Sequence, residues 1–457
     1  MAMLHNGRAA RRQTMRAIRP QRSGALPLLI LGWAGAAAVM ALWWQNTPLV
    51  RMALAEWLTG AGRLTGLLGG YMIAIVVLLM ARVPALERRV GSDRVARWHA
   101  MSGRYAICLV IAHVPLTIAG YAAQAQVDFV RQTVDMVTTF PRMIEATAGT
   151  VLFLIIGFVS VGMVRRRVAY ETWYYLHLLT YVAVYLTFWH QLATGAEFVG
   201  DATARTAWYV LYGAAGALLV WYRVLTPIRL NQRHRMQVHS TVYEAPGVVS
   251  VLISGRRLHR LGAEPGQFFR WRFRTSGLRW SSNPYSLSAP PRPDLLRITV
   301  RANGEHSEAL SRLEPGTRVW AEGPYGAMTA ARRSKEKVLM IAGGAGITPM
   351  RALFETLPGG PGDLTLLYRA SKTEDLALWA ELREIASARG ARLLYAVNGP
   401  DGVRPEITTD RLRELLPDIE DHDVYVCGPT GLARQTYDAL RAAGVPTRRI
   451  HHESFEM

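Results

Sequence analysis

The stretch RWHAMSGRYAICLVIAHVPL, residues 97–116, decides the fold of the N-terminal half, because it places two histidines in an apolar run of membrane-spanning length. An imidazole in hydrocarbon is costly unless something binds it. His99 and His113 are 14 residues apart, which is about 21 Å of helical rise and leaves the side chains about 40° apart. The stretch therefore predicts a buried helix that presents two polar groups at two depths.

Similar apolar runs lie on both sides of this stretch. The loops between them alternate in charge: the tail before residue 25, the 84–98 loop, the turn Arg165–Arg167 and the segment after Arg223 are rich in arginine. Basic loops face the cytoplasm, so both termini are expected there, in a multi-pass protein of the cell membrane. An all-α bundle of six transmembrane helices is predicted at about residues 25–44, 64–83, 99–121, 147–164, 170–193 and 206–224.

The fifth of these spans also carries two histidines, His177 and His190, and runs in the same direction as the third. Their 13-residue separation is about 20 Å of rise, so the two helices present histidines at matching depths. Two neutral imidazoles facing each other across a porphyrin hold a b-type haem, so the pattern predicts two haems. A 13-residue step turns a straight helix by about 220°, which requires either a distorted fifth helix or different histidine rotamers.

Other uses of these residues are less consistent with the pattern. Membrane histidines also form interhelical hydrogen bonds, but two pairs of matched spacing favour paired ligands. A zinc site is disfavoured, because neither histidine pair is accompanied by a carboxylate or thiolate that could act as a further ligand. The only cysteines, Cys108 and Cys427, cannot build a disulfide framework or a four-cysteine iron–sulfur site. The net charge of +19 is concentrated in basic loops and nucleic-acid motifs are missing, so no nucleic-acid partner is expected.

After about residue 230 the pattern changes to short alternating strands separated by turn residues, which predicts an antiparallel β-barrel. Within it, NPYSLSAPP, residues 283–291, presents Tyr285 and Ser286 on a strand, where an aromatic ring and a hydroxyl can contact a flavin. The turn from Gly304 to Ser307 opens a short helix whose backbone N–H groups suit a pyrophosphate. Packing alone also explains many aromatic–serine pairs in strands.

The segment VLMIAGGAGITPMRALFETL, residues 338–357, runs from a buried strand through a glycine turn into a helix whose first turn holds Pro349. Glycines let the backbone approach phosphates and the helix N-terminus favours their charge, so this is a dinucleotide-binding arrangement. Two more strands, LTLLYRA and HDVYVCGPTGL, follow with helical segments between them, which predicts an α/β doubly wound sheet. Cys427 ends the last of these strands, at the edge where ligands bind.

With four paired histidines, NPYSLS, GGAGITPM, VYVCGP and the ending HHESFEM in this order, the sequence resembles the ferric reductase and NADPH oxidase superfamily from about residue 60 onward. The resemblance implies that His99 and His177 ligate an inner haem and that His113 and His190 ligate an outer one. It also implies four parts: a basic cytoplasmic tail at 1–24, a six-helix haem-binding domain at 25–230, an FAD-binding β-barrel at 231–333 and an NAD(P)H-binding domain at 334–457.

The resemblance also assigns residues to the other cofactors. Cys427 and Phe455 are the catalytic candidates, Cys427 beside the nicotinamide and Phe455 covering the flavin, although Glu456 and Met457 follow Phe455 where the family module often ends in an aromatic. The family often has His or Arg at the position of Asn283, so the flavin phosphate contact there is weaker or supplied elsewhere. FAD contacts are expected at Asn283, Tyr285, Ser286, Leu287, Ser288, Gly304 and Ser307. Contacts with NADPH, or with NADH as an alternative donor, are expected at Gly343, Gly344, Gly346, Thr348, Pro349, Arg369, Gly428 and Pro429.

Arg369 is the one residue that bears on the choice of dinucleotide. It follows a strand end and could pair with a 2′-phosphate, which would favour NADPH; an exposed arginine without a role is the alternative.

These assignments predict an NAD(P)H-dependent oxidoreductase that moves electrons from cytoplasmic NADPH through FAD and two haems to an acceptor outside. Dioxygen, giving superoxide, needs only access to the outer haem edge, whereas a ferric chelate needs a docking surface such as the outer loops with Arg51, Arg131 and Arg142. The rival from another class is a membrane-anchored, haem-free flavin reductase that serves a protein or quinone partner. Accessory subunits and oligomeric state stay open.

Overall fold

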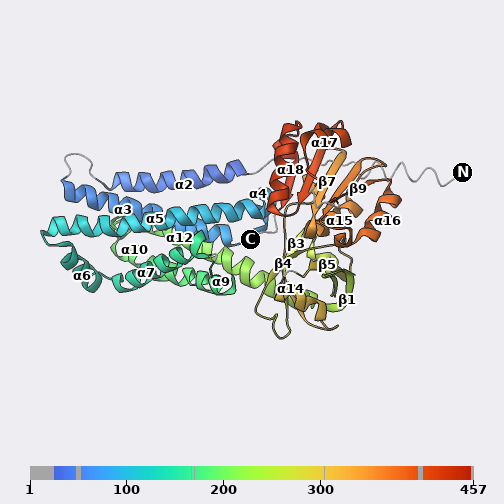
Figure 1. Ribbon diagram of the computed structural model, residues 1–457. Coiled ribbons are helices and arrows are strands. Elements are labelled where there is room, and N and C mark those ends of the chain that lie inside the picture. Colours follow the sequence, from blue (N-terminus) through green and yellow to red (C-terminus); the bar gives the residue numbers. More distant parts are fainter. Residues whose placement is uncertain are drawn as a thin grey trace. The chain divides into compact units, whose positions relative to one another are not determined.

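The computed structural model describes residues 25–47, 53–165, 167–168, 170–302, 304–399 and 405–453. By its internal contacts the chain divides into two compact units (Figure 1). The helical unit comprises residues 25–83 and 94–225, and the sheet unit comprises residues 84–93 together with everything from 226 onward. Each unit is described by itself.

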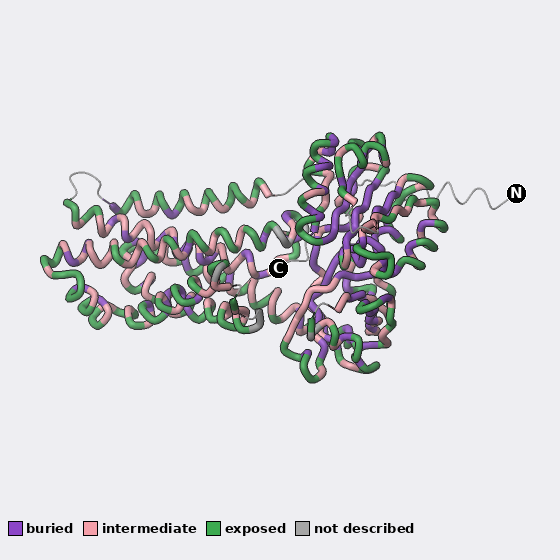
Figure 2. The backbone as a smooth tube through the Cα atoms, in the orientation of Figure 1, coloured by how far each residue is buried: buried purple, intermediate pink, exposed green. Residues whose placement is uncertain are grey.

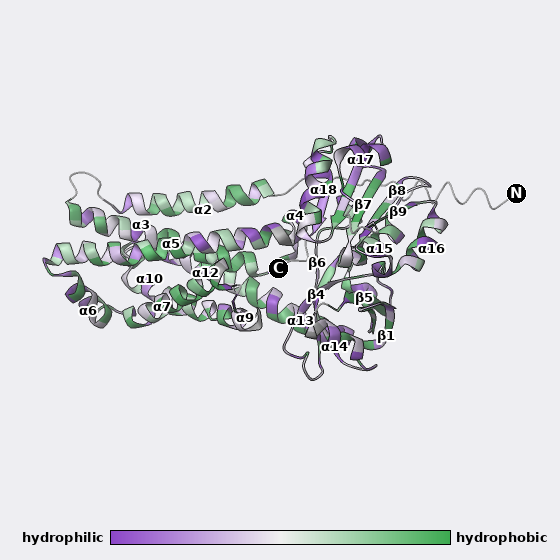
Figure 3. Cartoon of the chain, viewed as in Figure 1, coloured by the Kyte–Doolittle hydropathy of each residue, from purple (hydrophilic) through white to green (hydrophobic). Residues whose placement is uncertain are grey.

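The helical unit consists of long apolar helices with short connections. Its helices are green over most of their length in the hydropathy colouring of Figure 3, and many of their large apolar side chains are exposed, as is typical of surfaces that face lipid. The helices are α2 (Ala25–Gln45), α3 (Leu54–Met80), α5 (Ser92–Ala125), α6 (Phe129–Thr139), α7 (Met143–Val159), α8 (Gly162–Arg165), α9 (Tyr170–Leu178), α10 (Thr180–Thr194), α11 (Ala196–Val199) and α12 (Ala202–Val220), followed by the π-helical turn η1 (Trp221–Leu225).

The number of membrane-crossing helices differs from the six that the sequence predicts. Among the described residues, four helices are long and apolar enough to cross a membrane, namely Ala25–Gln45, Leu54–Met80, Arg94–Ala125 and Ala202–His234. The pair α6 and α7, bent by 115° between them, adds a fifth if it counts as one span. The predicted span at 170–193 is divided into α9 and α10, of 9 and 15 residues, each short of a bilayer's width. The prediction of six continuous spans is therefore corrected to four or five.

The division between α9 and α10 lies between the two histidines of this segment. Leu179 separates the two helices. Its N–H donates to the carbonyl of Leu176 at 3.1 Å, which closes a tight turn. The hydroxyl of Thr180 donates to the carbonyl of His177 at 2.6 Å, a back-bond that bends helices. Of the two alternatives for the 13-residue spacing, the structure thus shows a distorted helix.

Glycines bring α3 close to its neighbours. A Cβ added at Gly62 would lie 2.5 Å from Thr117 Oγ1, and one added at Gly120 would lie 2.3 Å from Thr59 Oγ1, so α3 and α5 approach at small residues. Such small-residue contacts are the usual basis of helix packing in membranes. The buried apolar centre where α3, α5, α7 and α10 meet consists of Ile73, Ala106, Phe153 and Ala183.

The sheet unit begins with an antiparallel half, defined by strands β1–β6. It contains two three-stranded sheets that enclose one apolar core around Phe269 and Trp271. Isolated bridges, Gln237 to Arg318 and Leu287 to Ile298, link their edges, but no single closed sheet forms among the described residues, so the predicted β-barrel is not confirmed as a closed sheet. The strands are β1 (Gln237–Ala245), β2 (Val248–Ser254) and β5 (Leu295–Arg301) in one sheet, and β4 (Asn283–Ser286), β3 (Phe268–Phe273) and β6 (Val319–Tyr325) in the other.

The rest of the sheet unit is a parallel half, defined by strands β7–β11. Its five-stranded sheet has the order β11-β10-β7-β8-β9, with every neighbouring pair parallel, which confirms the predicted doubly wound sheet. Figure 2 shows the central strands β7, β8 and β10 mostly buried, whereas β9 and β11 at the edges are largely intermediate or exposed. The strands are β7 (Lys337–Gly343), β8 (Leu364–Ala370), β9 (Arg392–Val397), β10 (His422–Cys427) and β11 (Ile450–Glu453); the helices are α15 (Ile347–Thr356), α16 (Trp379–Arg389), α17 (Thr409–Leu415) and α18 (Thr430–Ala442).

Three short helices complete the sheet unit: α4 (Pro84–Val90), α13 (Thr226–His234) and α14 (Glu305–Ala309). The side-chain amide of Asn231, on α13, both donates to the carbonyl of Ala321 and accepts from its N–H, each at 2.9 Å. Asn231 thereby pairs with β6 as a neighbouring strand would, which fixes α13 against the antiparallel half.

Candidate functional site

The first pair of histidines, His99 on α5 and His177 on α9, meets inside the helical unit. The ring centroids are 6.0 Å apart and the ring planes are inclined by 81°. An imidazole nitrogen binds a metal at about 2 Å, so two rings that hold one iron from opposite faces have centroids about 6 Å apart. The separation of these two rings therefore fits a bis-histidyl haem.

Hydrogen bonding prepares His99 to act as a ligand. Its Nδ1 lies 3.2 Å from the carbonyl oxygen of Val76, which can only accept, so Nδ1 carries the proton and Nε2 is left with a free lone pair. The Nδ1 of His177 is buried with no hydrogen-bond partner among the described residues. The His177 ring, whose Nδ1 has no such partner, lines an apolar pocket together with Leu152, Ile156 and Trp173.

Trp173 stacks on the face of the His177 ring and so restricts its orientation. The two rings stack with centroids 5.0 Å apart and planes inclined by 20°. The guanidinium of Arg165 lies 4.5 Å from the centre of the Trp173 ring, in a cation–π contact, and the indole N–H donates to Ser160 at 3.3 Å. The orientation of His177 is thus determined by three residues outside the pair.

The second pair, His113 on α5 and His190 on α10, lies one level further along these helices. The Nδ1 of His113 is 2.7 Å from the carbonyl oxygen of Gly62, which again leaves Nε2 free. A Cβ at Gly66 would lie 2.7 Å from the His113 ring, so the ring occupies space that only a glycine leaves.

The predicted flavin contacts divide into available and occupied side chains. Tyr285 is held by the indole N–H of Trp271, which donates to its carbonyl at 2.9 Å, and burial raises the pKa of Tyr285 to about 12 despite the opposing hydrogen bond from Asn283. Its phenol is therefore neutral and able to donate. The hydroxyl of Ser286 is buried with no partner among the described residues, as a group awaiting a ligand would be.

Leu287 and Ser288 are used within the protein. Leu287 is fully buried in the apolar core of the antiparallel half. Ser288 is also fully buried, and its hydroxyl accepts from Thr299 Oγ1 at 2.7 Å and from Arg297 Nε at 3.2 Å. Gly304 lies just before α14, and Ser307 Oγ donates to its carbonyl at 2.9 Å.

The predicted dinucleotide turn has the expected geometry. β7 ends at Gly343, a single 3-10 turn covers Gly344–Gly346, and α15 follows with Pro349 in its first turn. Gly344 has a φ of 55°, and a Cβ at Gly346 would lie 2.0 Å from the carbonyl oxygen of Cys427. The turn therefore depends on glycine both for its conformation and for its close approach to β10. Thr348 Oγ1 donates to the carbonyl of Ala345 at 2.9 Å.

The parallel register brings the remaining predicted residues to the same edge of the sheet. Arg369 pairs with Gly343 across β8 and β7, and Cys427 pairs with Ala342 across β10 and β7. Gly428 and Pro429 follow Cys427 directly, and the buried thiol of Cys427 contacts the carbonyl oxygen of Glu453 at 3.6 Å. Phe455 lies outside the described residues.

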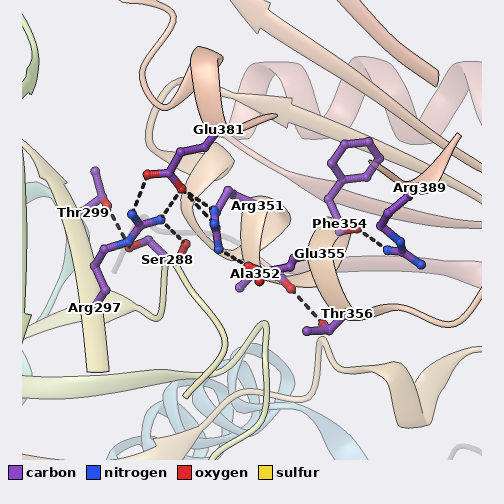
Figure 4. Close-up of polar contacts among 10 residues, drawn as sticks. All are labelled: Ser288, Arg297, Thr299, Arg351, Ala352, Phe354, Glu355, Thr356, Glu381 and Arg389. Atoms are coloured by element: carbon purple, nitrogen blue, oxygen red, sulfur yellow. Dashed lines mark hydrogen bonds and ion pairs between the residues drawn. The ribbon is translucent and has the colours of Figure 1, made fainter. Parts of the chain in front are cut away.

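Three charged residues that were not predicted as site residues are Arg297, Arg351 and Glu381. They form a partly buried network between the two halves of the sheet unit, drawn in Figure 4. A single arginine in each of two otherwise apolar runs, LLRITV and PMRALF, was the signal available. Among the described residues, no group of three or more His, Cys, Asp or Glu side chains forms a metal site.

Two family models match this chain. Residues 65–188 match the ferric reductase like transmembrane component, and residues 340–438 match the oxidoreductase NAD-binding domain. The first match contains His99, His113 and His177, and the second contains the glycine turn and Cys427.

Two named relatives each match less than half of the chain. The stachydrine N-demethylase reductase subunit Stc4 of Rhizobium meliloti is 30% identical over 224 residues, 46% of this chain and 64% of that protein. The ferredoxin reductase component of 3-ketosteroid-9-alpha-monooxygenase from Mycolicibacterium smegmatis is 33% identical over 203 residues, 43% of this chain and 57% of that protein. The match thus spans less than two thirds of the length of these relatives. Among solved structures, the Amycolatopsis cytochrome P450 reductase GcoB is 24% identical with a TM-score of 0.42, covering 49% of this chain and 69% of its own.

Residues 65–188 are thus similar to a ferric reductase-like transmembrane domain, and residues 340–438 to an oxidoreductase NAD-binding domain, in the order that the resemblance of the sequence motifs implies.

Proposed function

We propose that this chain is a transmembrane flavocytochrome b oxidoreductase that takes electrons from cytoplasmic NADPH and delivers them to an acceptor outside the membrane. The observation that carries the proposal is the meeting of His99 and His177 at a separation that fits one iron, in the same chain as a dinucleotide-binding sheet. Bound FAD would convert a two-electron hydride into single electrons, and two b-type haems would carry these across a hydrocarbon core about 30 Å thick.

The residues of the chain have distinct tasks in this proposal. His99 and His177 hold the inner haem, and His113 and His190 hold the outer one. Tyr285 and Ser286 bind the flavin through a neutral phenol and an unpartnered hydroxyl. The glycine turn from Gly343 to Gly346 admits the pyrophosphate at the start of α15.

Specificity for NADPH is proposed to come from Arg369, which ends β8 beside Gly343. In parallel sheets of this type an arginine near the second strand end accommodates a 2′-phosphate. Gly428 and Pro429, at the neighbouring strand end, are proposed to border the nicotinamide with Cys427.

The acceptor is proposed to be dioxygen or a ferric chelate. Reduction of cytochrome c that superoxide dismutase suppresses would indicate dioxygen. Formation of a ferrous complex under anaerobic conditions, insensitive to dismutase, would indicate a ferric chelate.

The rival proposal is a membrane-anchored flavin reductase without haem, and it is favoured by one observation. Both relatives named above are reductase components of multi-component systems. In that case electrons would pass from the sheet unit to a partner protein or quinone.

An anaerobic visible spectrum of the purified, FAD-supplemented chain before and after NADPH distinguishes the two. Sharp reduced b-type bands, with two haems per chain in a pyridine assay, are expected from the proposed electron path. Flavin bleaching without any haem signal in a folded preparation would exclude that path and leave the anchored reductase.

A further inference from the structure

Glu381 on α16 binds two arginines at once. Its two carboxylate oxygens accept from Nη1 and Nη2 of Arg297 at 2.7 and 2.9 Å, and Oε2 also accepts from Nε of Arg351 at 2.8 Å (Figure 4). Arg351 is in addition paired with Glu355 on its own helix. Two-point arginine–carboxylate contacts of this kind fix orientation as well as distance.

The two arginines come from different halves of the sheet unit. Arg297 lies on β5 of the antiparallel half, and its guanidinium also donates to the carbonyl of Ser288 at 3.0 Å, two residues beyond the flavin candidate Ser286. Arg351 lies on α15 of the parallel half, five residues beyond Gly346 of the dinucleotide turn. Glu381 therefore joins the segment proposed to hold the flavin to the helix proposed to hold the dinucleotide.

The network is shielded from water on the arginine side. The Arg297 side chain is 15% exposed and the Arg351 side chain is 11% exposed, against 32% for Glu381. Without Glu381 the largely buried guanidinium of Arg297 would lose its carboxylate, and Arg351 would keep only Glu355, so the halves separate only at a cost. The arrangement is thus more rigid than an exposed ion pair, which contributes little.

A second set of contacts joins the antiparallel half to the parallel half. Arg301 on β5 is paired with Asp375 at 3.0 Å, and Ala245, Val248, Ala377 and Leu378 form a small buried apolar cluster beside it. This second contact lets the halves stay associated when the Glu381 pairing is weakened. Glu381 can therefore affect the relative placement of the halves without being needed for their folding.

We propose that Glu381 is a positioning residue that sets the distance between nicotinamide and flavin for hydride transfer. This inference rests on the proposed function. The step moves one hydride, that is two electrons and one proton, from the reduced nicotinamide to the flavin, so the dinucleotide leaves oxidised and the flavin is reduced by two electrons. A misplacement of about 1 Å costs such a step about 100-fold in rate.

The test uses the full-length, FAD-loaded chain and stopped-flow flavin reduction by NADPH under anaerobic conditions. Glu381→Gln keeps the size of the side chain but removes the charge that holds both guanidiniums. The limiting rate of flavin reduction is expected to fall about tenfold or more, because a loosened geometry is displaced by a fraction of an ångström. The FAD content and the NADPH concentration at half-maximal rate are expected to stay within about twofold of the wild-type values, well short of a tenfold change in binding.

Asp421→Asn is the matched control, because it breaks an exposed ion pair with Lys335 on the same unit. Its limiting rate is expected to equal that of the wild type. The primary isotope effect with NADPH deuterated at the transferred position is expected to rise in Glu381→Gln alone, a change that mere loss of stability would not produce.

A wild-type limiting rate in folded, FAD-loaded Glu381→Gln would overturn the inference. Should that variant fail to fold, Arg297→Lys takes its place, since a lysine keeps the charge but cannot bind the carboxylate at two points, and the same criteria apply. Absence of flavin reduction in the wild-type chain would instead overturn the proposed function, and the inference with it. The two failures are therefore distinguishable.

Discussion

The imidazole planes of His99 and His177 are nearly perpendicular, at 81°, although the rings lie only 6.0 Å apart between centroids. The angle has a structural cause, because each ring is fixed by different neighbours. Val76 holds His99 through Nδ1, whereas Trp173 holds His177 by stacking. In a haem held by this pair, perpendicular ring planes would leave two iron d orbitals close in energy, whereas parallel planes would separate them.

The proposed inner haem is therefore expected to give a highly anisotropic low-spin signal in the electron paramagnetic resonance spectrum of the oxidised protein. The measurement is cleanest in a His113→Ala, His190→Ala double variant, which retains only the inner pair. A rhombic signal of the kind that parallel rings give would contradict the observed ring geometry. Trp173→Leu should change the signal, because it removes the surface against which His177 stacks.

Gly66→Ala is expected to displace the His113 ring, because the new Cβ would lie 2.7 Å from it. The variant should lose the proposed outer haem and keep the proposed inner one, so the haem content per chain in a pyridine assay should fall by about half, as expected for one of two haems. Gly213→Ala on α12 is the control, since nothing lies within 4 Å of its Cβ. Equal haem content in both variants would argue against His113 as a ligand.

Gly346→Ala is expected to weaken dinucleotide binding, because its Cβ would lie 2.0 Å from the carbonyl oxygen of Cys427 and force the turn away from β10. A rise in Kd of at least about tenfold, or about 1.4 kcal/mol, is expected in titrations with NADP⁺. Gly431→Ala, with nothing within 4 Å of its Cβ, should bind like the wild type. Unchanged affinity in Gly346→Ala would place the dinucleotide elsewhere.

The stability of the sheet unit is expected to depend on the ionisation of Asp423. Burial opposes its charge, but hydrogen bonds from His451 and from the backbone of Ser334 and Lys335 outweigh burial and hold the pKa of Asp423 below its usual value. A lowered pKa contributes stability above the unfolded-state value of about 3.9, and this is lost as the pH falls through the folded-state value.

Asp423→Asn should lower the free energy of unfolding at neutral pH by about 1–3 kcal/mol, because the donors around the carboxylate lose their charged acceptor. The difference from the wild type should shrink as the pH falls below about 4, which denaturant titrations at several pH values would reveal. A difference that is independent of pH in the acid range would mean that the charge of Asp423 contributes nothing.

Periodicity and turn chemistry alone were enough to predict much of the fold. The β7 strand, the glycine turn and α15 follow from the run of apolar residues into Gly343, Gly344 and Gly346, because only a glycine turn can place a backbone beside β10 at this distance. The predicted depths of the four histidines likewise rest on helical rise alone. These are local properties, determined by residues near one another in the chain.

Packing between distant residues decided the rest. The break at Leu179 is accompanied by a side-chain hydrogen bond of Thr180, which hydropathy does not report, so a continuous span was predicted there. The bend between α6 and α7 lies between the predicted spans at 99–121 and 147–164, where no helix was predicted. The two antiparallel sheets remain open because their edges meet at isolated bridges rather than at continuous ladders. The perpendicular setting of His99 and His177, and the meeting of Arg297 and Arg351 on Glu381, join residues far apart in sequence, where spacing carries no information about contact.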